Sequence, residues 1–330
     1  MKKSVLVTLA DKNYVEQAKQ LFSGAYHNAG WSGDYCLLSY KIPEKELRWF
    51  KERGIYVKEC GEEIEKKYSG KQKMPSRYFC FNGKESGKKT FLMMSKKFLV
   101  FTPEFKKWDI VVFLDSDIIV KKSLERLKKT KNFLAAPRNI FMSKGRKIEN
   151  LFLKGTKKDR EIFEQIKKEN NVSKKAFNAG VFAFNTRIIR KNTFENLKNL
   201  FKKYSKISYY GDEPIMNLYF SKKWEELPIG YNLCINIFGK RFEKTSPIIH
   251  FAGLNKEGKP WKDVNPHYYE WLENLRKAEH TDFRIHKKIR TKSPYVLLLF
   301  QSFYLNFINP FEKKFSEIIG KLDKNPKRIF

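Results

Sequence analysis

One apolar run constrains the fold of this chain more than any other feature. Residues Ile110–Leu114 read IVVFL and lead directly into two aspartates separated by one residue. An uninterrupted apolar run of this kind is typical of a strand that is buried on both faces, as in a parallel sheet covered by helices. Short apolar runs alternate with helical patterns through the first half of the chain, which favours the same architecture. We therefore predict an α/β fold with a mostly parallel, Rossmann-like sheet flanked by helices.

The spacing of apolar residues gives expected bounds for the elements. Strands are predicted at residues 5–10, 35–39, 55–57, 110–114, 177–184 and 248–251. Helices are predicted at residues 14–27, 44–52, 90–101 and 187–204, and another is expected to begin near residue 212. Two segments rich in Lys, Gly and Ser are predicted to be long loops, at residues 61–89 and 138–156. The pattern changes after Trp271, so we expect one domain at residues 1–280 and a separate segment at residues 281–330.

The net charge of the chain limits the kinds of molecule that it is expected to bind. The 330 residues include 68 basic and 36 acidic side chains, for a net charge of +32. Such an excess favours nucleic acid, an anionic membrane face or a phosphorylated substrate as the partner. The basic residues are spread along the chain without a nucleic-acid recognition motif, so we expect no nucleic-acid partner. A non-enzymatic protein that binds nucleic acid or a membrane surface stays open as the alternative to an enzyme.

The cysteines and the N-terminus bear on cellular location. The cysteines form no CxxC pair, and their spacing fits neither a disulfide framework nor a zinc site: Cys36, Cys60, Cys80 and Cys234. Free thiols are typical of a reducing compartment. The first apolar run is short and leads into Asp11 and Lys12, which favours a buried strand over a signal peptide. Since no apolar run reaches the ~20 residues that span a bilayer, we expect a cytoplasmic protein.

The paired carboxylates after the apolar run are the first chemical signal. Side chains at positions i and i+2 of an extended chain point the same way, so Asp115 and Asp117 can form a two-pronged oxygen site. Such ligands suit Mg²⁺ or Mn²⁺. A D-x-D pattern alone is weak, because a solvated turn after a strand gives the same residues. A nucleotidyltransferase also uses paired aspartates on a strand, so other signals are needed.

Three further groups lie downstream. An apolar run ends in His250, followed by Gly253, which allows close approach to a ligand, and by Lys259, a point charge for phosphate. Asn178, which has both a donor and an acceptor, suits a pair of sugar hydroxyls. Asp212 and Glu213 open an expected helix. Each group alone has an ordinary structural explanation, such as a buried histidine or a helix cap.

In this order and spacing, the four groups resemble the retaining glycosyltransferases of family 8, which include glycogenin and bacterial lipopolysaccharide galactosyl- and glucosyltransferases. The resemblance spans roughly residues 4–262. Its most specific part pairs the FLDSD motif at residues 113–117 with HFAG at residues 250–253 and KPW at residues 259–261. It implies a GT-A fold and an enzyme that moves a hexose from a UDP-sugar, with UDP-glucose or UDP-galactose favoured. The implied acceptor is a glycan, such as a cell-surface or lipid-linked polysaccharide.

The resemblance also implies roles for individual residues. Mn²⁺, or Mg²⁺ in its place, is expected to be held by Asp115, Asp117 and His250. The donor-binding set that the resemblance implies comprises Thr8, Ala10, Asp11, Tyr14, Lys97, Ser116, Asn178, Ala179, Gly253 and Lys259. Within that set, the residues near the first strand would hold the uridine, and Gly253 with Lys259 would contact the diphosphate. Asp212 and Glu213 are the expected catalytic pair.

One residue departs from the family pattern. Where Glu213 stands, the family more often has glutamine. This position lies on the face of the sugar where a nucleophile would be needed, and a carboxylate can carry charge or act as a nucleophile, unlike an amide. We therefore expect an electrostatic role for Glu213, with a covalent role left open.

The segment at residues 281–330 is basic and then apolar. Basic residues recur between residues 284 and 292, and an apolar, aromatic-rich stretch of about fourteen residues follows from Tyr295. It is too short to span a bilayer, but this order suits a helix lying in an anionic membrane interface. A terminal helix packed on the catalytic domain is the alternative. We expect a basic, amphipathic helical appendage that holds the enzyme peripherally on the inner face of the membrane, near a lipid-linked acceptor.

Overall fold

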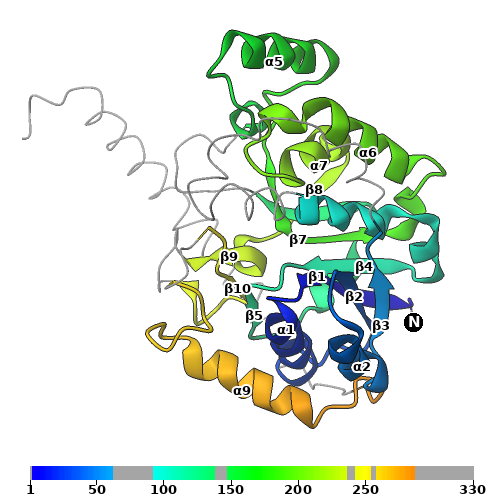
Figure 1. Cartoon of the computed structure of the whole chain (residues 1–330), viewed down its shortest axis with the longest axis vertical. Helices are drawn as coiled ribbons and strands as arrows, with labels where there is room; N and C mark the ends of the chain where they lie inside the picture. The colour runs from blue at the N-terminus through cyan, green and yellow to red at the C-terminus, as the bar shows by residue number, and fades with distance from the viewer. Residues whose placement is uncertain (1, 62–91, 138–146, 236–241, 254–257, 287–330) are drawn as a thin grey trace, which may run out of the picture.

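The computed structural model describes residues 2–61, 92–137, 147–235, 242–253 and 258–286. Its centre is a seven-stranded sheet with the order β3-β2-β1-β4-β7-β6-β8 (Figure 1). The strands are β1 (Ser4–Asp11), β2 (Asp34–Tyr40), β3 (Tyr56–Glu59), β4 (Ile110–Leu114), β6 (Phe133–Pro137), β7 (Phe177–Asn185) and β8 (Trp224–Glu226). Only β7 runs antiparallel to its neighbours, β4 and β6. The predicted α/β fold with a largely parallel sheet is therefore confirmed.

A second, three-stranded sheet lies beside the carboxyl end of β4. It has the order β5-β10-β9 and comprises β5 (Ile118–Val120), β9 (Leu233–Cys234) and β10 (Ile248–His250). β10 pairs antiparallel with β5 and parallel with β9. Because β5 begins directly after the paired aspartates, this small sheet brings residues near position 250 to the end of β4.

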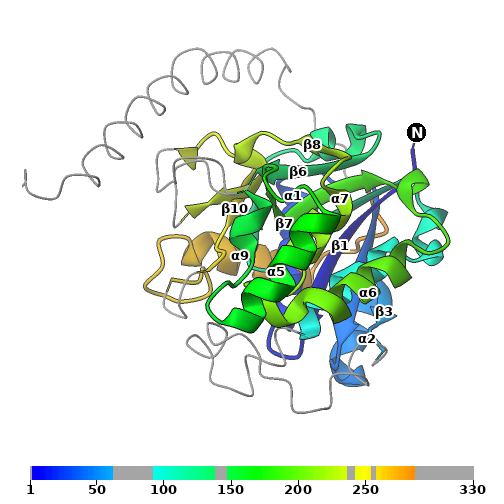
Figure 2. The same ribbon diagram turned by 90° about the horizontal axis from the view of Figure 1, so that it is seen from above.

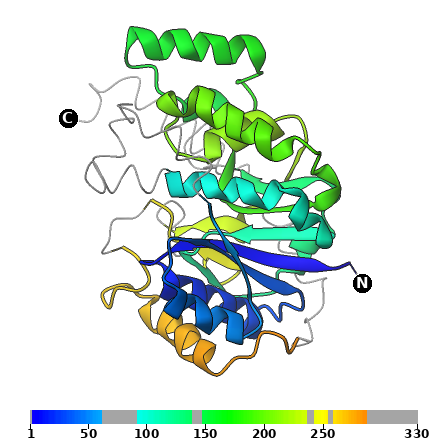
Figure 3. The same cartoon turned by 45° about the vertical axis from the view of Figure 1, so that its right-hand side comes forward.

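Helices cover both faces of the central sheet (Figure 3). One layer consists of α1 (Val15–His27), α2 (Glu44–Glu52) and α9 (Tyr268–Glu279). The opposite layer holds α5 (Lys157–Glu169), α6 (Thr193–Tyr204), α7 (Glu213–Phe220) and the 3-10 helix η2 (Lys96–Phe101). Figure 2 looks down on this second layer, with α5 and α6 in front of the sheet. Shorter 3-10 helices are η3 (Pro103–Lys107), η4 (Glu125–Lys129), η5 (Ile148–Leu151), η6 (Thr186–Ile188), η7 (Ser205–Ile207) and η8 (Ile229–Asn232).

The alternation of side chains along β1 explains the two cores. Val5 and Val7 pack with the η2 and α6 layer, whereas Leu6 and Ala10 pack with the α1 and α2 layer. Successive side chains of a strand point to opposite faces, so a strand that is buried along almost its whole length, as β1 is, serves both layers. A cluster of phenylalanines fills the first core, in which the Phe113 and Phe182 rings stack 4.9 Å apart.

Several predicted bounds need correction. The expected helix at residues 187–204 is wrong in its first part, because a 3-10 turn ends at Ile188 and α6 begins only at Thr193. The Thr193 hydroxyl accepts a hydrogen bond from the Arg190 N–H (2.7 Å), which favours a turn before the helix. The expected helix at residues 90–101 is helical from residue 92, within the described residues, but its second half is a 3-10 helix. The loop predicted at residues 138–156 contains η5.

Most of the expected C-terminal appendage lies outside the described residues, which end at residue 286. The predicted loop at residues 61–89 is outside them as well, except for its first residue. Across the described ranges, no helix is both long and apolar enough to cross a bilayer.

Candidate active site

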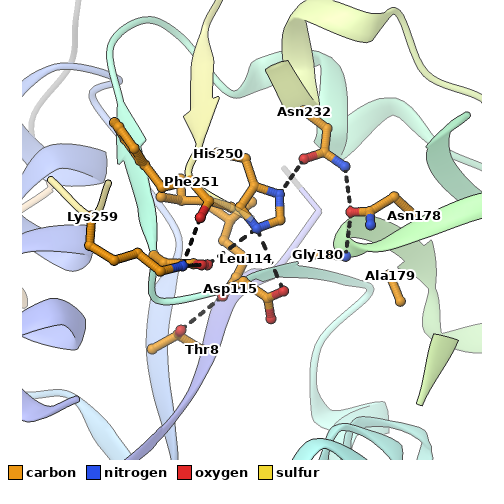
Figure 4. A network of polar contacts seen from close by, with 12 residues as sticks. Thr8, Leu114, Asp115, Asn178, Ala179, Gly180, Asn232, His250, Phe251 and Lys259 are labelled. Carbon is orange, nitrogen blue, oxygen red and sulfur yellow. Dashed lines mark hydrogen bonds and ion pairs between the residues drawn. The ribbon is translucent and has the colours of Figure 1, made fainter. Parts of the chain in front are cut away.

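The candidate site is built at the end of β4, where backbone or side-chain hydrogen bonds join it to β1, β7 and the end of β10. The Asp115 N–H at the end of β4 donates to the Gly180 carbonyl of β7 (2.8 Å). The Phe251 N–H, just after β10, donates to the Asp117 carbonyl (3.0 Å). The Thr8 hydroxyl of β1 donates to the Leu114 carbonyl (2.8 Å; Figure 4). These bonds fix the backbone on both sides of the D-x-D motif, so its side chains project from a rigid edge.

Two carboxylates and one imidazole converge at this edge. Ligand atoms of Asp115, Asp117 and His250 all lie within 4.8 Å of one another. His250 Nε2 is 3.2 Å from an Asp117 oxygen and 3.8 Å from an Asp115 oxygen. Oxygen and imidazole ligands at this spacing suit a divalent cation such as Mn²⁺ or Mg²⁺, so the residues fit the metal that the sequence predicted.

The electrostatics of this group are strongly coupled. Burial lowers the pKa of His250, but the Asp117 charge and hydrogen bond outweigh it and raise that pKa to about 10. Burial raises the pKa of Asp117, but Lys259 and His250 outweigh it and hold that pKa well below its usual range. Asp117 is therefore an anion in a cationic surrounding, which is the state in which a carboxylate binds a metal.

Lys259 lies against the same carboxylate. Its Nζ is 2.6 Å from Asp117 Oδ2 and donates to the Phe251 carbonyl (2.7 Å). Gly253, between them in sequence, has φ +68°, a left-handed conformation that favours glycine. The HFAG and KPW motifs thus meet the D-x-D motif in the structure.

A buried lysine occupies the other side of Asp115. Lys97 Nζ lies 2.8 Å from Asp115 Oδ1 and 2.9 Å from Asp212 Oδ2, and it donates to the Ala179 carbonyl (3.3 Å). Burial lowers the pKa of Lys97, but the two carboxylates outweigh it and hold that pKa above its usual value. Burial, the largest influence, raises the pKa of Asp115, and Lys97 and His250 offset it only in part.

Glu213 is held by the loop at the start of β7. Its Oε2 accepts hydrogen bonds from Asn178 Nδ2 (2.8 Å) and from the Ala179 N–H (3.3 Å). Glu213 is 5% exposed and Asp212 is 2% exposed. Both expected catalytic carboxylates therefore lie in the same enclosed cluster as Asn178 and Lys97.

The expected uridine-binding residues on and after β1 differ in how far their side chains are available to a ligand. Ala10 packs into the core, so only its backbone faces outward, and the Thr8 hydroxyl is bonded within the protein. Asp11 accepts from the Asn13 N–H (2.9 Å) in the turn that opens α1. Burial and then the Asp117 charge raise the pKa of Tyr14, so its hydroxyl is within electrostatic reach of the metal group. The Tyr14 ring packs edge-on against Trp261, at 5.6 Å between centroids.

Sequence reasoning missed two residues of the network. The Oδ1 of Asn232 lies 2.7 Å from His250 Nδ1, and its Nδ2 donates to Asn178 Oδ1 (2.8 Å; Figure 4). It precedes the two-residue strand β9, which is too short to produce a pattern. Gly180 faces His250 so closely that a Cβ there would lie 2.2 Å from the ring carbon Cε1. Ser116 was expected to contact the donor. It lies between the two aspartates in the sequence, and its side chain is buried.

Comparison with known protein families decides the assignment. The model of the family described as glycosyl transferase family 8 matches residues 5–265. The chain belongs to glycosyltransferase family 8. The predicted family is thereby confirmed, and the protein is a glycosyltransferase.

Solved structures of other glycosyltransferases share its fold. The galactosyltransferase LgtC, in complex with donor and acceptor sugar analogues, matches with a TM-score of 0.56 and 14% identity over 88% of this chain and 98% of LgtC. The bifunctional glycosyltransferase WbbM matches with a TM-score of 0.56 and 18% identity over 91% of this chain. GlyE of Streptococcus pneumoniae TIGR4 matches with a TM-score of 0.51 and 21% identity over 83% of this chain. The family 8 chain spans about half of WbbM (51%) and 60% of GlyE.

At these identities the likeness concerns the fold alone, and it confirms the predicted GT-A architecture. A comparison with curated protein sequences gave no significant match.

Proposed function

We propose that this family 8 enzyme is a metal-dependent, retaining hexosyltransferase that uses a UDP-sugar, with UDP-glucose or UDP-galactose favoured. The observation that carries the proposal is the meeting of Asp115, Asp117 and His250 beside Lys259. A divalent cation and a lysine at one edge of the sheet are suited to a diphosphate, whereas the enclosed carboxylates beyond Asp115 are suited to sugar hydroxyls. LgtC, solved with donor and acceptor sugar analogues, supports a donor and an acceptor of this kind.

Asp115, Asp117 and His250 would hold the cation, Mn²⁺ or Mg²⁺. When bound, such an ion supplies positive charge that stabilises the departing diphosphate. Lys259 adds a second positive charge there, because it already lies 2.6 Å from Asp117. Gly253 and the residues after β1, including Tyr14, would complete the binding of the diphosphate and uridine, with Ala10 contributing its backbone.

The sugar would lie on the other side of Asp115. Lys97 holds the Asp115 and Asp212 carboxylates in place through ion pairs of 2.8 and 2.9 Å. Preorganised carboxylate and amide groups bind sugar hydroxyls without having to reorganise during the reaction. Asn178 and Asp212 are the groups that we assign to donor hydroxyls, with Ala179 lining the pocket.

Glu213 would act on the anomeric carbon. Departure of the diphosphate leaves positive character on the sugar, which a nearby carboxylate stabilises. Retention requires either attack on the face from which the diphosphate leaves or two successive inversions through a protein nucleophile. We assign Glu213 the electrostatic role, because its Oε2 is already engaged by Asn178 and the Ala179 N–H.

A donor panel tests this proposal. Each UDP-sugar is incubated with the full-length chain and Mn²⁺, and UDP release is measured before and after chelation of the metal. We expect hydrolysis of one or two UDP-hexoses that stops on chelation. NMR of the transferred sugar should show the anomeric configuration of the donor, and an inverted product would contradict the retaining mechanism.

We also propose that the basic segment at residues 281–330 docks the enzyme on an anionic membrane, where a lipid-linked glycan would be the acceptor. The net charge of +32 supports this, since each basic residue near such a surface contributes ~1 kcal/mol. Vesicles containing anionic lipid should sediment the full chain in low salt and release it in high salt. A chain ended after residue 286 should stay in solution, and equal sedimentation of the two chains would contradict the proposal.

A further inference from the structure

The two nitrogens of the His250 ring face different groups. Nε2 faces the carboxylates of Asp115 and Asp117, whereas Nδ1 lies 2.7 Å from Asn232 Oδ1. Which nitrogen carries the hydrogen decides whether Nε2 can offer a lone pair to a cation. A ring and an amide side by side do not settle this, since each can be turned over. The direction of the bond must come from a group that can only donate or only accept.

The backbone N–H of Gly180 is such a group. It points at Asn178 Oδ1 (3.0 Å), and because a backbone N–H can only donate, this atom of Asn178 must be the acceptor. The Nδ2 of Asn178 therefore faces Glu213 Oε2 (2.8 Å) and donates to it. The Ala179 N–H donates to the same Glu213 oxygen, which agrees with this direction.

The direction then passes to the next amide. Since Asn178 Oδ1 is an acceptor, the atom of Asn232 that faces it at 2.8 Å must be the donor Nδ2. The other atom, Oδ1, therefore faces His250, and an amide oxygen requires a hydrogen on Nδ1. Asn232 is 1% exposed, so water has little access to replace it.

Gly180 also holds the ring from another side. A Cβ at this position would lie 2.2 Å from His250 Cε1 and 2.9 Å from Asp115 Oδ2. The ring thus has Asn232 at Nδ1 and the bare backbone of β7 against its Cε1 edge. One glycine both donates the hydrogen bond that sets the direction and leaves the space that the ring fills.

We infer that Asn232 is a positioning residue that, through Asn178 and the Gly180 N–H, keeps a hydrogen on His250 Nδ1, so that Nε2, which faces the Asp117 carboxylate in the metal-free protein, is the nitrogen that gives up its hydrogen and binds the metal. The inference rests on the proposed metal site. Partners at the second nitrogen of a metal-binding histidine set the orientation of the ring and tune its affinity. The same chain of bonds ends at Glu213, so it also ties the orientation of the proposed metal ligand to that of the proposed catalytic carboxylate.

Metal titration separates this role from a merely structural one. Mn²⁺ binding, alone and with saturating UDP, is measured for the wild type, for Asn232→Leu and for the control Asn274→Leu. Asn274 is buried to a similar degree (2% exposed) but bonds to Asn28, the residue that follows α1, away from the site. We expect Asn232→Leu to bind Mn²⁺ about 10–100-fold more weakly, and Asn274→Leu to lose stability without losing affinity. Wild-type affinity in a folded Asn232→Leu would overturn the inference but leave the proposed function standing. Failure of the wild type to bind Mn²⁺ in either condition would overturn the metal site and the inference with it.

A second measurement needs no folded Asn232 variant. Two-bond ¹⁵N–¹H NMR of ¹⁵N-histidine protein reports which nitrogen carries the hydrogen, and the five histidines keep the spectrum simple. The His250 signals are identified by their loss in His250→Gln. With Cd²⁺ as a diamagnetic replacement for Mn²⁺, we expect a protonated Nδ1 and an Nε2 shifted by the metal. A hydrogen on Nε2, or metal at Nδ1, would overturn the inference.

Discussion

The ion pairs on the two sides of Asp115 differ in how far they are exposed to solvent. One oxygen of this carboxylate faces His250 at 3.8 Å and the other faces Lys97 at 2.8 Å. On the His250 side, Asp117 and Lys259 keep 15% and 12% of their side chains exposed. On the Lys97 side, the lysine and Asp212 keep 5% and 3%. The first pair is accessible enough to exchange partners with a ligand, whereas the second is a fixed internal ion pair.

This difference assigns separate tasks to the two sides. A cation or a diphosphate can enter the pair of Asp117 and Lys259, because part of each group is still solvated. Lys97 instead neutralises two carboxylates that would otherwise repel each other in a low-dielectric site. We therefore expect substitutions on the first side to act on ligand binding and turnover, and substitutions of Lys97 to act on stability as well.

Replacing each lysine separately by methionine should give the largest difference between the two sides of Asp115. Lys97→Met leaves the buried Asp212 and the partly exposed Asp115 without their shared cation, which should lower the free energy of unfolding by about 3–5 kcal/mol. Lys259→Met removes a partly solvated ion, so its cost in stability should be smaller than that of Lys97→Met, while the KM for the donor rises. Urea unfolding of both variants measures this, and equal losses of stability would refute the distinction.

Asp115→Asn tests the residue that belongs to both sides. The amide keeps the shape but loses the charge that faces His250 and Lys97, so sugar transfer should fall by about 10²–10³-fold. UDP release measures the change, with the exposed Asp263→Asn as a matched control that should keep full activity. Full activity in Asp115→Asn would remove it from the site.

Glu213→Gln tests whether Glu213, on the Lys97 side of Asp115, acts through its charge or through a covalent bond. If the carboxylate acts by its charge alone, transfer should slow by about 10²-fold but stay measurable. If it forms a covalent bond to the sugar, transfer should be undetectable, because an amide is a poor nucleophile. Steady-state rates with the preferred donor separate the two, and wild-type rates would exclude Glu213 from the mechanism.

Gly180→Ala should give the smallest effect, at the boundary between the two sides. The added methyl meets His250 and Asp115, and overpacking of this kind costs about 1–3 kcal/mol. We expect a modest fall in melting temperature together with weaker Mn²⁺ binding. Gly24→Ala is the control, because its nearest neighbour, Asn274 Nδ2, would be 3.3 Å away and lies outside the site. Equal Mn²⁺ affinity in both variants would mean that the ring does not depend on Gly180.

Strands β1, β2 and β4 could be predicted from the sequence because each is marked by a short apolar run of its own. β4 is apolar throughout, and β1 and β2 are mostly apolar and almost wholly buried. The same local logic located Asp115 and Asp117. β5 and β9 escaped prediction because strands of three and two residues carry no periodic pattern, and their pairing with β10 depends on tertiary contacts.

Among the site residues, those proposed to contact the metal or the donor could be predicted from the sequence, whereas those that hold them in position could not. His250 and Lys259 could be found since a histidine after an apolar run and a nearby lysine are recognisable in sequence. Lys97 was placed only loosely, by family resemblance, and the structure gives it two carboxylate partners. Asn232 had no sequence signal, because its role arises from donor and acceptor directions across three separate elements.

The central claim is that sugar transfer depends on a cation held at the D-x-D motif, and one titration tests it most directly. UDP release from the preferred UDP-hexose is followed against Mn²⁺ concentration for the wild type and for Asp117→Ala, after both have been stripped of metal. We predict that the wild type is inactive without metal and saturates with Mn²⁺, whereas folded Asp117→Ala stays inactive at every concentration. Wild-type rates in metal-free Asp117→Ala would contradict the account.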